Sequence, residues 1–118
     1  MTTNQADIIE NLTQVLRSRR DDDPRDSYVA SLYARGLNKI LEKVGEEAVE
    51  VLLAARDAEG EPGRPHRDDA LIGEVADLWF HSLVMLVHLE QEPRWVLEEL
   101  QRRFGTSGHE EKASRERE

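Results

Sequence analysis

The chain has 118 residues, of which 38% are hydrophobic, and this suits one small domain with one modest core. Its formal net charge of −9 argues against a general nucleic-acid-binding role, and the absence of cysteine excludes disulfides and thiol chemistry. The N-terminus has no basic region followed by an apolar run, and the most apolar stretch, 78–89, is about half the ~20 residues of a membrane-spanning helix. We therefore expect a soluble, cytoplasmic protein without a membrane or nucleic-acid partner.

The first half of the chain predicts two helical stretches separated by a charged break that contains proline. The first stretch is expected to begin near Asp7, whose side chain could cap its N-terminus. The second is long, covering about 28–56, and Ser27 or Asp26 could cap it. Gly36 lies inside this stretch and could bend it.

The second half predicts an exposed loop over 57–69, because the segment combines two prolines with two glycines. A third helix is expected over about 70–89, with an aspartate at its start as a cap. A fourth is expected to begin at Pro93 and to end at Gly105. No segment shows the alternation of a strand, so the fold class is all-α, a four- to five-helix bundle within a single domain over 1–118. Its core is expected over about 7–105, followed by a charged tail over 106–118.

Two acidic clusters interrupt otherwise apolar helical segments, and they are the most informative feature of the sequence. Residues three apart share a helix face, so Glu47 and Glu50 form one carboxylate pair and Glu74 and Asp77 form another. Two like charges 4 Å apart cost on the order of 4 kcal/mol at an effective dielectric constant near 20. Oxygen ligands without cysteine indicate a hard cation, Mg²⁺ or Mn²⁺, and such a site usually acts on a phosphate substrate.

An alternative for the first cluster is that its acids are exposed and pair with Lys39 and Lys43 in the same helix. The second cluster has no lysine or arginine within its own helix, which favours metal binding for the two clusters together. His81 lies one turn after Asp77. It is either a hydrogen-bond donor to a ligand or substrate, or a core residue whose polar atoms are satisfied.

The third helix is apolar around most of its circumference, and four helices in a chain this short cannot cover all of it. We therefore expect a partner subunit, most simply in a two-fold homodimer. The apolar residues that support this expectation are Leu71, Ile72, Leu78, Trp79, Phe80, Leu83, Leu86 and Val87.

Three motifs, in this order, resemble those of phosphoribosyl-ATP pyrophosphatase, a family within the all-α (MazG-like) nucleotide pyrophosphohydrolases. The first is S-Y-x-A-x-L-x-x-x-G at 27–36, and the second is G-E-E-x-x-E followed by E-x-x-D at 45–77. The third is F-G-x-S-G-x-E-E-K-A-S-R at 104–115. The resemblance implies hydrolysis of the α–β phosphoanhydride of phosphoribosyl-ATP to phosphoribosyl-AMP and pyrophosphate, the second step of histidine biosynthesis.

The resemblance also implies roles for individual residues. The metal-binding positions of the family correspond to Glu47, Glu50, Glu74 and Asp77. Glu46 matches a further acid, so Glu46 or Glu47 could accept the proton of the attacking water, or Glu46 could be an additional ligand. Basic residues must meet the phosphates, and the candidates are Lys43, Arg103, Lys112 and Arg115.

Two other functions remain open on the sequence alone. A housecleaning hydrolase of noncanonical nucleoside triphosphates would share the metal site and lack a selective pocket for the extra ribose phosphate. A non-enzymatic helical dimerisation module would use the same acids only as salt-bridge partners, and it would not respond to divalent cations.

Overall fold

The computed structural model describes residues 7–60 and 67–105, and within those ranges its regular secondary structure is all helical, with no strand. This confirms the predicted all-α fold class. The helices are α1 (Ile8–Ser18), the short 3₁₀ turn η2 (Arg19–Asp21), α2 (Tyr28–Arg35), α3 (Leu37–Glu59), α4 (Asp69–His88) and α5 (Pro93–Phe104).

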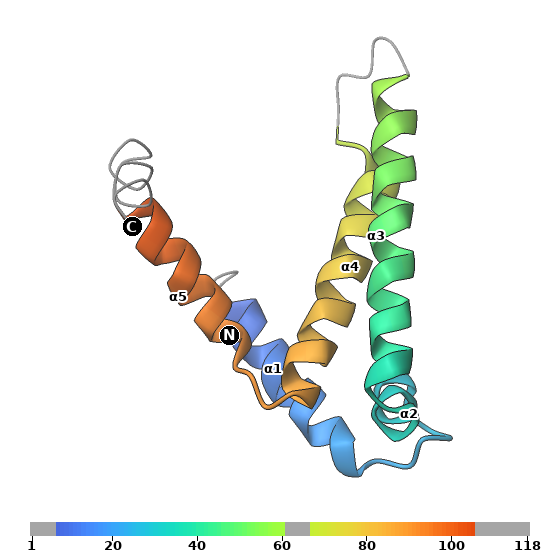
Figure 1. The fold of residues 1–118 in the computed structure, drawn as a ribbon, viewed down its shortest axis with the longest axis vertical. Coiled ribbons are helices and arrows are strands. Elements are labelled where there is room, and N and C mark those ends of the chain that lie inside the picture. The colour runs from blue at the N-terminus through green and yellow to red at the C-terminus, as the bar shows by residue number, and fades with distance from the viewer. Residues whose placement is uncertain (1–6, 61–66, 106–118) are drawn as a thin grey trace, which may run out of the picture.

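The helices form two groups that diverge from a common base (Figure 1). The long helices α3 and α4 run side by side in opposite directions, with α2 beneath them, while α1 and α5 lead away to the other side (Figure 1). The radius of gyration is 17.5 Å, against about 13 to 14 Å for a compact domain of this length. The single chain is therefore open, and much of its apolar surface stays uncovered.

Gly36 divides the second predicted helical stretch into two helices, so the prediction of one long helix from 28 to 56 was wrong. Its φ of 91° is a conformation that residues with a Cβ rarely adopt, and glycine adopts it at little cost. Gly36 ends α2 and begins α3, which allows α2 to turn under the α3–α4 pair.

The predicted helix ends are confirmed in four places and corrected in two. Ser27 caps α2 by accepting a hydrogen bond from the Ala30 amide at 3.1 Å, and Pro93 occupies the start of α5, which ends before Gly105. Asp68 caps α4 by accepting from the Leu71 amide at 3.1 Å. Asp7 precedes α1, but its side chain makes no capping hydrogen bond. The predicted loop began too early, because α3 continues to Glu59.

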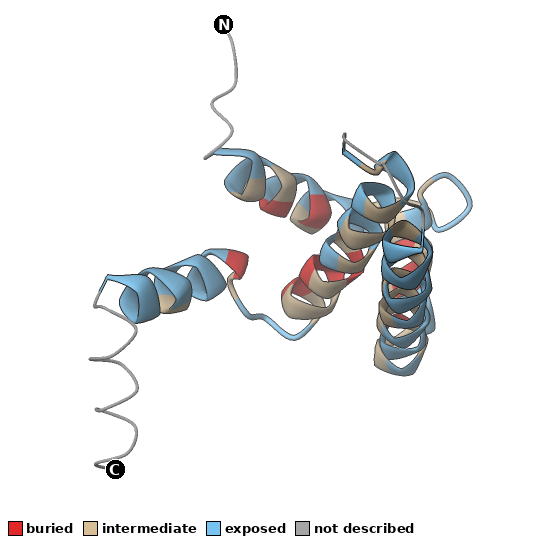
Figure 2. Ribbon diagram, turned by 90° about the horizontal axis from the view of Figure 1, so that it is seen from above, coloured by how far each residue is buried: buried red, intermediate tan, exposed pale blue. Residues whose placement is uncertain are grey.

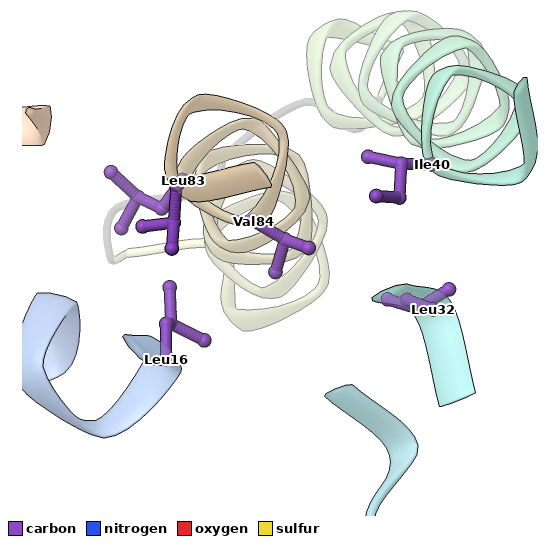
Figure 3. Packing of buried hydrophobic residues seen from close by; sticks show 6 residues of the cluster. Leu16, Leu32, Ile40, Leu83 and Val84 are labelled. Carbon is purple, nitrogen blue, oxygen red and sulfur yellow. The ribbon is translucent and has the colours of Figure 1, made fainter. Parts of the chain in front are cut away.

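The buried core lies at the base, where α1, α2, α3 and α4 meet. Figure 3 shows side chains from all four helices pointing toward one another. Within α3 only Ile40 is fully buried, whereas the neighbouring Leu41 is 44% exposed. The core cluster consists of Leu16, Leu32, Ile40, Leu83, Val84 and Val87.

Helix α4 leaves much of its apolar surface exposed along the side that faces away from α3. Trp79 is 63% exposed and Ile72 is 49% exposed, and exposed residues dominate α5 as well (Figure 2). An apolar groove of about 310 Å³ lies where α1, α4 and α5 come together, and Trp79, Leu97 and Leu100 are among its lining residues. The structure therefore supports the uncovered apolar surface from which a partner subunit was predicted.

Helix α4 is long and apolar enough to cross a membrane by length and composition alone. The sequence argument against a membrane span considered only the apolar stretch 78–89, whereas the whole helix has 20 residues. The core helix of a soluble protein meets the same two criteria, and α4 supplies buried residues to the core from its C-terminal half. The acidic residues Glu74 and Asp77 lie within this helix.

Candidate metal centre

Three of the four predicted ligands come together between α3 and α4. Carboxylate oxygens of Glu47, Glu74 and Asp77 all lie within 4.8 Å of one another. The two helices run in opposite directions, so a pair of acids one turn apart on α3 faces a similar pair on α4. Glu47 and Glu74 are half-buried and Asp77 is exposed, so the cluster is accessible to solvent in the single chain.

Glu50, the fourth predicted ligand, lies beside this cluster and is exposed in the single chain. Its negative charge raises the pKa of Glu74, as do the charges of Asp77 and Glu47, and the largest cause of the raised pKa is partial desolvation of the Glu74 carboxyl. Four acids thus share one electrostatic environment, and the nearest cation to them on α3 is a single lysine.

That lysine is Lys43, which lies one turn before Glu47. Its ammonium donates a hydrogen bond to Glu46 at 3.2 Å and lies 3.9 Å from Glu47. The hydrogen bond to Glu46 raises the pKa of Lys43, as do the nearby Tyr28 hydroxyl and Glu47, while partial desolvation opposes this. The same contact lowers the pKa of Glu46. The salt-bridge alternative therefore describes Glu46 well and leaves the α4 acids unaccounted for.

The space above the cluster is an open hollow of about 710 Å³ between the far ends of α3 and α4. Glu50 and Glu74 line it on the side of the cluster, and Asp57 and Asp69 line it at the far end. Arg67 also lines this hollow and pairs with Asp69 at 2.7 Å. Its acidic lining would repel a polyphosphate unless cations were bound with it.

Below the cluster, His81 is buried and both of its ring nitrogens are satisfied. Nδ1 lies 2.8 Å from the backbone carbonyl oxygen of Asp77, and Nε2 lies 2.8 Å from the Tyr28 hydroxyl. The ring also makes edge contacts with Tyr28 and Phe80. Sequence reasoning left the role of His81 open and did not single out Tyr28, although the latter falls within the first motif. Contact across 53 positions could not be seen in the sequence.

The remaining predicted cations are not brought to the cluster within the described part of one chain. Arg103 lies on α5, which leads away from α3 (Figure 1), and it pairs with Glu99 at 3.0 Å. Lys112 and Arg115 lie outside the described residues. His88 stacks against Tyr33 near the base, with ring centroids 6.0 Å apart.

The donor set of this centre is made of carboxylate oxygens only, which fits Mg²⁺ or Mn²⁺ and does not fit a metal that prefers nitrogen or sulfur. A divalent cation there would offset the charge repulsion recorded in the raised pKa of Glu74. Partial exposure of the cluster leaves room for a phosphate group to complete the coordination.

The all-α fold is consistent with that of the MazG-like pyrophosphohydrolases, and it carries an acidic cluster between two antiparallel helices. Within that class, the family model described as phosphoribosyl-ATP pyrophosphohydrolase matches residues 9–104. The match covers most of the chain and includes both acidic clusters, and the chain belongs to this family. The family assignment agrees with the resemblance found in the sequence motifs.

Proposed function

We propose that this protein is a soluble, cytoplasmic phosphoribosyl-ATP diphosphatase. It hydrolyses the α–β phosphoanhydride of phosphoribosyl-ATP, giving phosphoribosyl-AMP and pyrophosphate in the second step of histidine biosynthesis. The observation that carries the proposal is the convergence of Glu47, Glu74 and Asp77 within 4.8 Å in a chain of the phosphoribosyl-ATP pyrophosphohydrolase family.

In the proposed mechanism, Glu47, Glu50, Glu74 and Asp77 hold Mg²⁺, for which Mn²⁺ can substitute. The bound cation supplies charge neutralisation at the phosphate oxygens and lowers the pKa of a coordinated water. A carboxylate of the first cluster, Glu46 or Glu47, accepts a proton from the attacking water. Glu47 lies within the cluster, whereas Glu46 lies outside it and pairs with Lys43.

We also propose that the active form is a homodimer and that basic residues bind the outer phosphates. Lys43 is close enough to the acids to serve its own chain. Arg103 would reach an acidic cluster only in a second copy, because α5 leads away from α3 of its own chain. The proposal includes Lys112 and Arg115 on the strength of the sequence motif alone.

The test is pyrophosphate release from phosphoribosyl-ATP, measured in Mg²⁺ and in excess chelator, alongside the same measurement with plain nucleoside triphosphates. Preference for phosphoribosyl-ATP and complete dependence on the cation are expected. Preference for the plain triphosphates would favour the housecleaning hydrolase. Full activity in chelator would exclude the metal-dependent mechanism.

A further inference from the structure

Helix α3 carries an exposed apolar stripe on a side that its own chain leaves uncovered. The stripe consists of residues that recur every four or three positions and therefore share one face: Leu41, Gly45, Val49 and Leu52. Leu52 is 65% exposed and Val49 is 53% exposed. Helix α3 packs mainly on α4 and α2, and the buried Ile40 points toward them from another face (Figure 3). The α3 stripe is thus an apolar surface without a cover among the described residues.

Gly45 makes a shallow notch in the middle of the α3 stripe. A Cβ at this position would meet no atom within 4 Å beyond its chain neighbours and the backbone of its own helix. Glycine inside a helix is less stable than alanine, so Gly45 brings no local advantage to the single chain. A second helix can approach more closely where one position lacks a side chain. The stripe therefore has the shape that receives a bulky side chain from another helix.

Helix α5 carries a second apolar face, and this face becomes exposed as α5 leaves the base. Pro93, Val96, Leu97 and Leu100 line the groove between α4 and α5. Pro93 is buried at the start of the helix, whereas Leu97 is 44% exposed and Leu100 is 45% exposed. The two helices diverge from this point (Figure 1). The apolar face of α5 thus continues beyond the region that its own α4 covers.

We propose that α5 of one copy packs along the α3 stripe of a second copy, while the exposed apolar side of α4 faces its equivalent in the partner. The two open molecules interlock, and the α3–α4 pair of each lies between α4 and α5 of the other. This inference rests on the proposed homodimer and specifies which surfaces form it.

The area that a stable dimer needs favours this arrangement over contact through α4 alone. A stable interface buries about 800 Å² on each partner. A tryptophan side chain contributes about 150 to 250 Å² when it is fully buried, so Trp79 and its neighbours on one helix supply only part of that area. Packing of α5 on the α3 stripe supplies more, and it occurs twice in a two-fold dimer. The α3 stripe, α4 and α5 are then all covered within one closed assembly.

The chain beyond residue 105 is a poorer candidate for the same surfaces. Its last ten residues are mostly charged, with acidic and basic residues alternating in groups. Burial of such residues against leucine and valine side chains would leave charges without water or partners. A second copy offers apolar faces that match those left open, so it is the occupant that the chemistry favours.

Interlocking also brings a cation toward the acids. Arg103 lies on α5, and in this arrangement α5 runs beside α3 of the partner, the helix that carries Glu47 and Glu50. The role proposed for Arg103 requires such a neighbour, because α5 leads away from α3 of its own chain. Each acidic cluster would then be completed by a residue from the other copy.

The first experiment is cross-linking between single cysteines, which are unambiguous because the natural chain has none. Chains with Leu52→Cys and Leu100→Cys are co-expressed and treated with a short bismaleimide, and a covalent dimer is expected. Either chain alone should give none, because each position and its equivalent lie on opposite outer sides of the interlocked dimer. The matched control is Glu98→Cys, two residues from Leu100 and on the opposite face of α5, which should not link to Leu52→Cys.

The second experiment fills the notch. Gly45→Leu should still fold, because the new side chain meets open space in its own chain. It should raise the dissociation constant of the dimer about tenfold or more in sedimentation, since overpacking an interface is costly. Gly45→Ala is the control: it removes the same glycine, adds one methyl group and should keep the dimer. The helical circular dichroism of all three proteins should be alike.

The outcomes separate this inference from the proposed function. A parent that is dimeric, with no product between Leu52→Cys and Leu100→Cys, overturns the inference alone, as does an unchanged dissociation constant in Gly45→Leu. Cross-linking of Leu52→Cys to itself would show that two α3 stripes face each other, which also overturns it. A monomeric parent overturns the proposed homodimer together with the inference. Turnover of phosphoribosyl-ATP by the parent tests the proposed reaction separately.

Discussion

The α3–α4 pair and the α1–α5 side of the molecule are both helical, but they differ in the kind of side chain that lies between their helices. Between α3 and α4, above the apolar core at the base, acids from both helices form a cluster, and Lys43 and His81 lie one turn below it. Between α4 and α5 the facing residues are apolar and line an open groove. Helices α3 and α4 contact each other along their length, whereas α4 and α5 leave an apolar surface exposed to solvent.

Helix α4 belongs to both regions and carries a different chemistry toward each. Asp77 belongs to the acidic cluster, whereas Trp79, two residues later and on another face, lines the apolar groove. One helix thus presents the candidate metal ligands on one face and the exposed apolar residues on another. Substitutions two residues apart can therefore test the two faces independently.

The largest effect is expected from removing a ligand charge. Asp77→Asn should lower turnover by more than about 100-fold, since even partners behind a metal ligand cost 10- to 100-fold when lost. The metal-free variant should melt no lower than the parent, because the change relieves repulsion among the acids.

The matched control for this change is Glu42→Gln, an exposed acid of α3 that pairs with Lys39 at 3.5 Å outside the cluster. It should retain turnover and the Mg²⁺-induced rise in melting temperature. Near-normal turnover of Asp77→Asn at saturating Mg²⁺ would show that the ligand assignment is wrong. Unfolding of Asp77→Asn would instead favour a structural role for the carboxylate.

The next largest effect is expected from charging the apolar groove. Trp79→Glu should convert a homodimer to a monomer at micromolar concentration, because a carboxylate would be buried without a partner in the interface. Sedimentation of the parent and the variant measures this. Phe104→Glu, at a residue that is 79% exposed and does not line the groove, should stay dimeric. A monomeric parent would contradict the proposed dimer outright.

A smaller effect concerns Glu74 and pH. The pKa of Glu74 in the folded state is raised above the ordinary 4.5. At lower pH the carboxyl is protonated in both the folded and the unfolded state and therefore does not change the free energy of unfolding. As pH rises through the folded-state pKa, ionisation destabilises the metal-free fold. Glu74→Gln should therefore match the parent near pH 4 and be more stable at pH 7 in chelator. Denaturant unfolding at both pH values measures this, and saturating Mg²⁺ should reverse the order at pH 7.

The smallest effect belongs to the α1–α5 side. Arg102 and Arg103 donate hydrogen bonds to Glu99 and lower its pKa to about 2. Ionised Glu99 therefore stabilises the folded state at pH values above 4.5, its ordinary pKa, and this contribution is lost as the pH falls through about 2. Glu99→Gln should lower the melting temperature slightly at pH 7 and not at pH 2. Glu98→Gln removes an equal charge next to it and is the control. Solvent exposure keeps the difference small.

Helix periodicity predicted the fold class and the acidic cluster, because residues three apart share a face in any helix. Glu74 and Asp77 could thus be placed together before α3 and α4 were known to be neighbours. Gly36 could not be read as a break, since a glycine inside a helical pattern is also compatible with a bend. The extent of burial could not be predicted, as the 44% exposure of Leu41 shows, because helical periodicity identifies an apolar face and does not tell how many helices are available to cover it.

The Tyr28–His81 contact lay beyond sequence reasoning for a different reason. It joins α2 to α4 across the break at Gly36, so its existence depends on a change of chain direction at one residue. A tyrosine at the start of a helix and a histidine in an apolar one have no periodic relation. Only the arrangement of the helices brings them together.

The position of Tyr28 beside His81 depends on the backbone conformation of one residue, Gly36. If φ at this position became negative and helical, α2 and α3 would merge into one rod, and Tyr28 would stand about 12 Å beyond position 36 along its axis. The hydrogen bond between Tyr28 and His81 would then be lost while all four acids kept their places on α3 and α4. A side chain at position 36 would thus strain the turn that holds Tyr28 against His81 and leave the acidic cluster untouched, an effect unlike that of any substitution within the cluster.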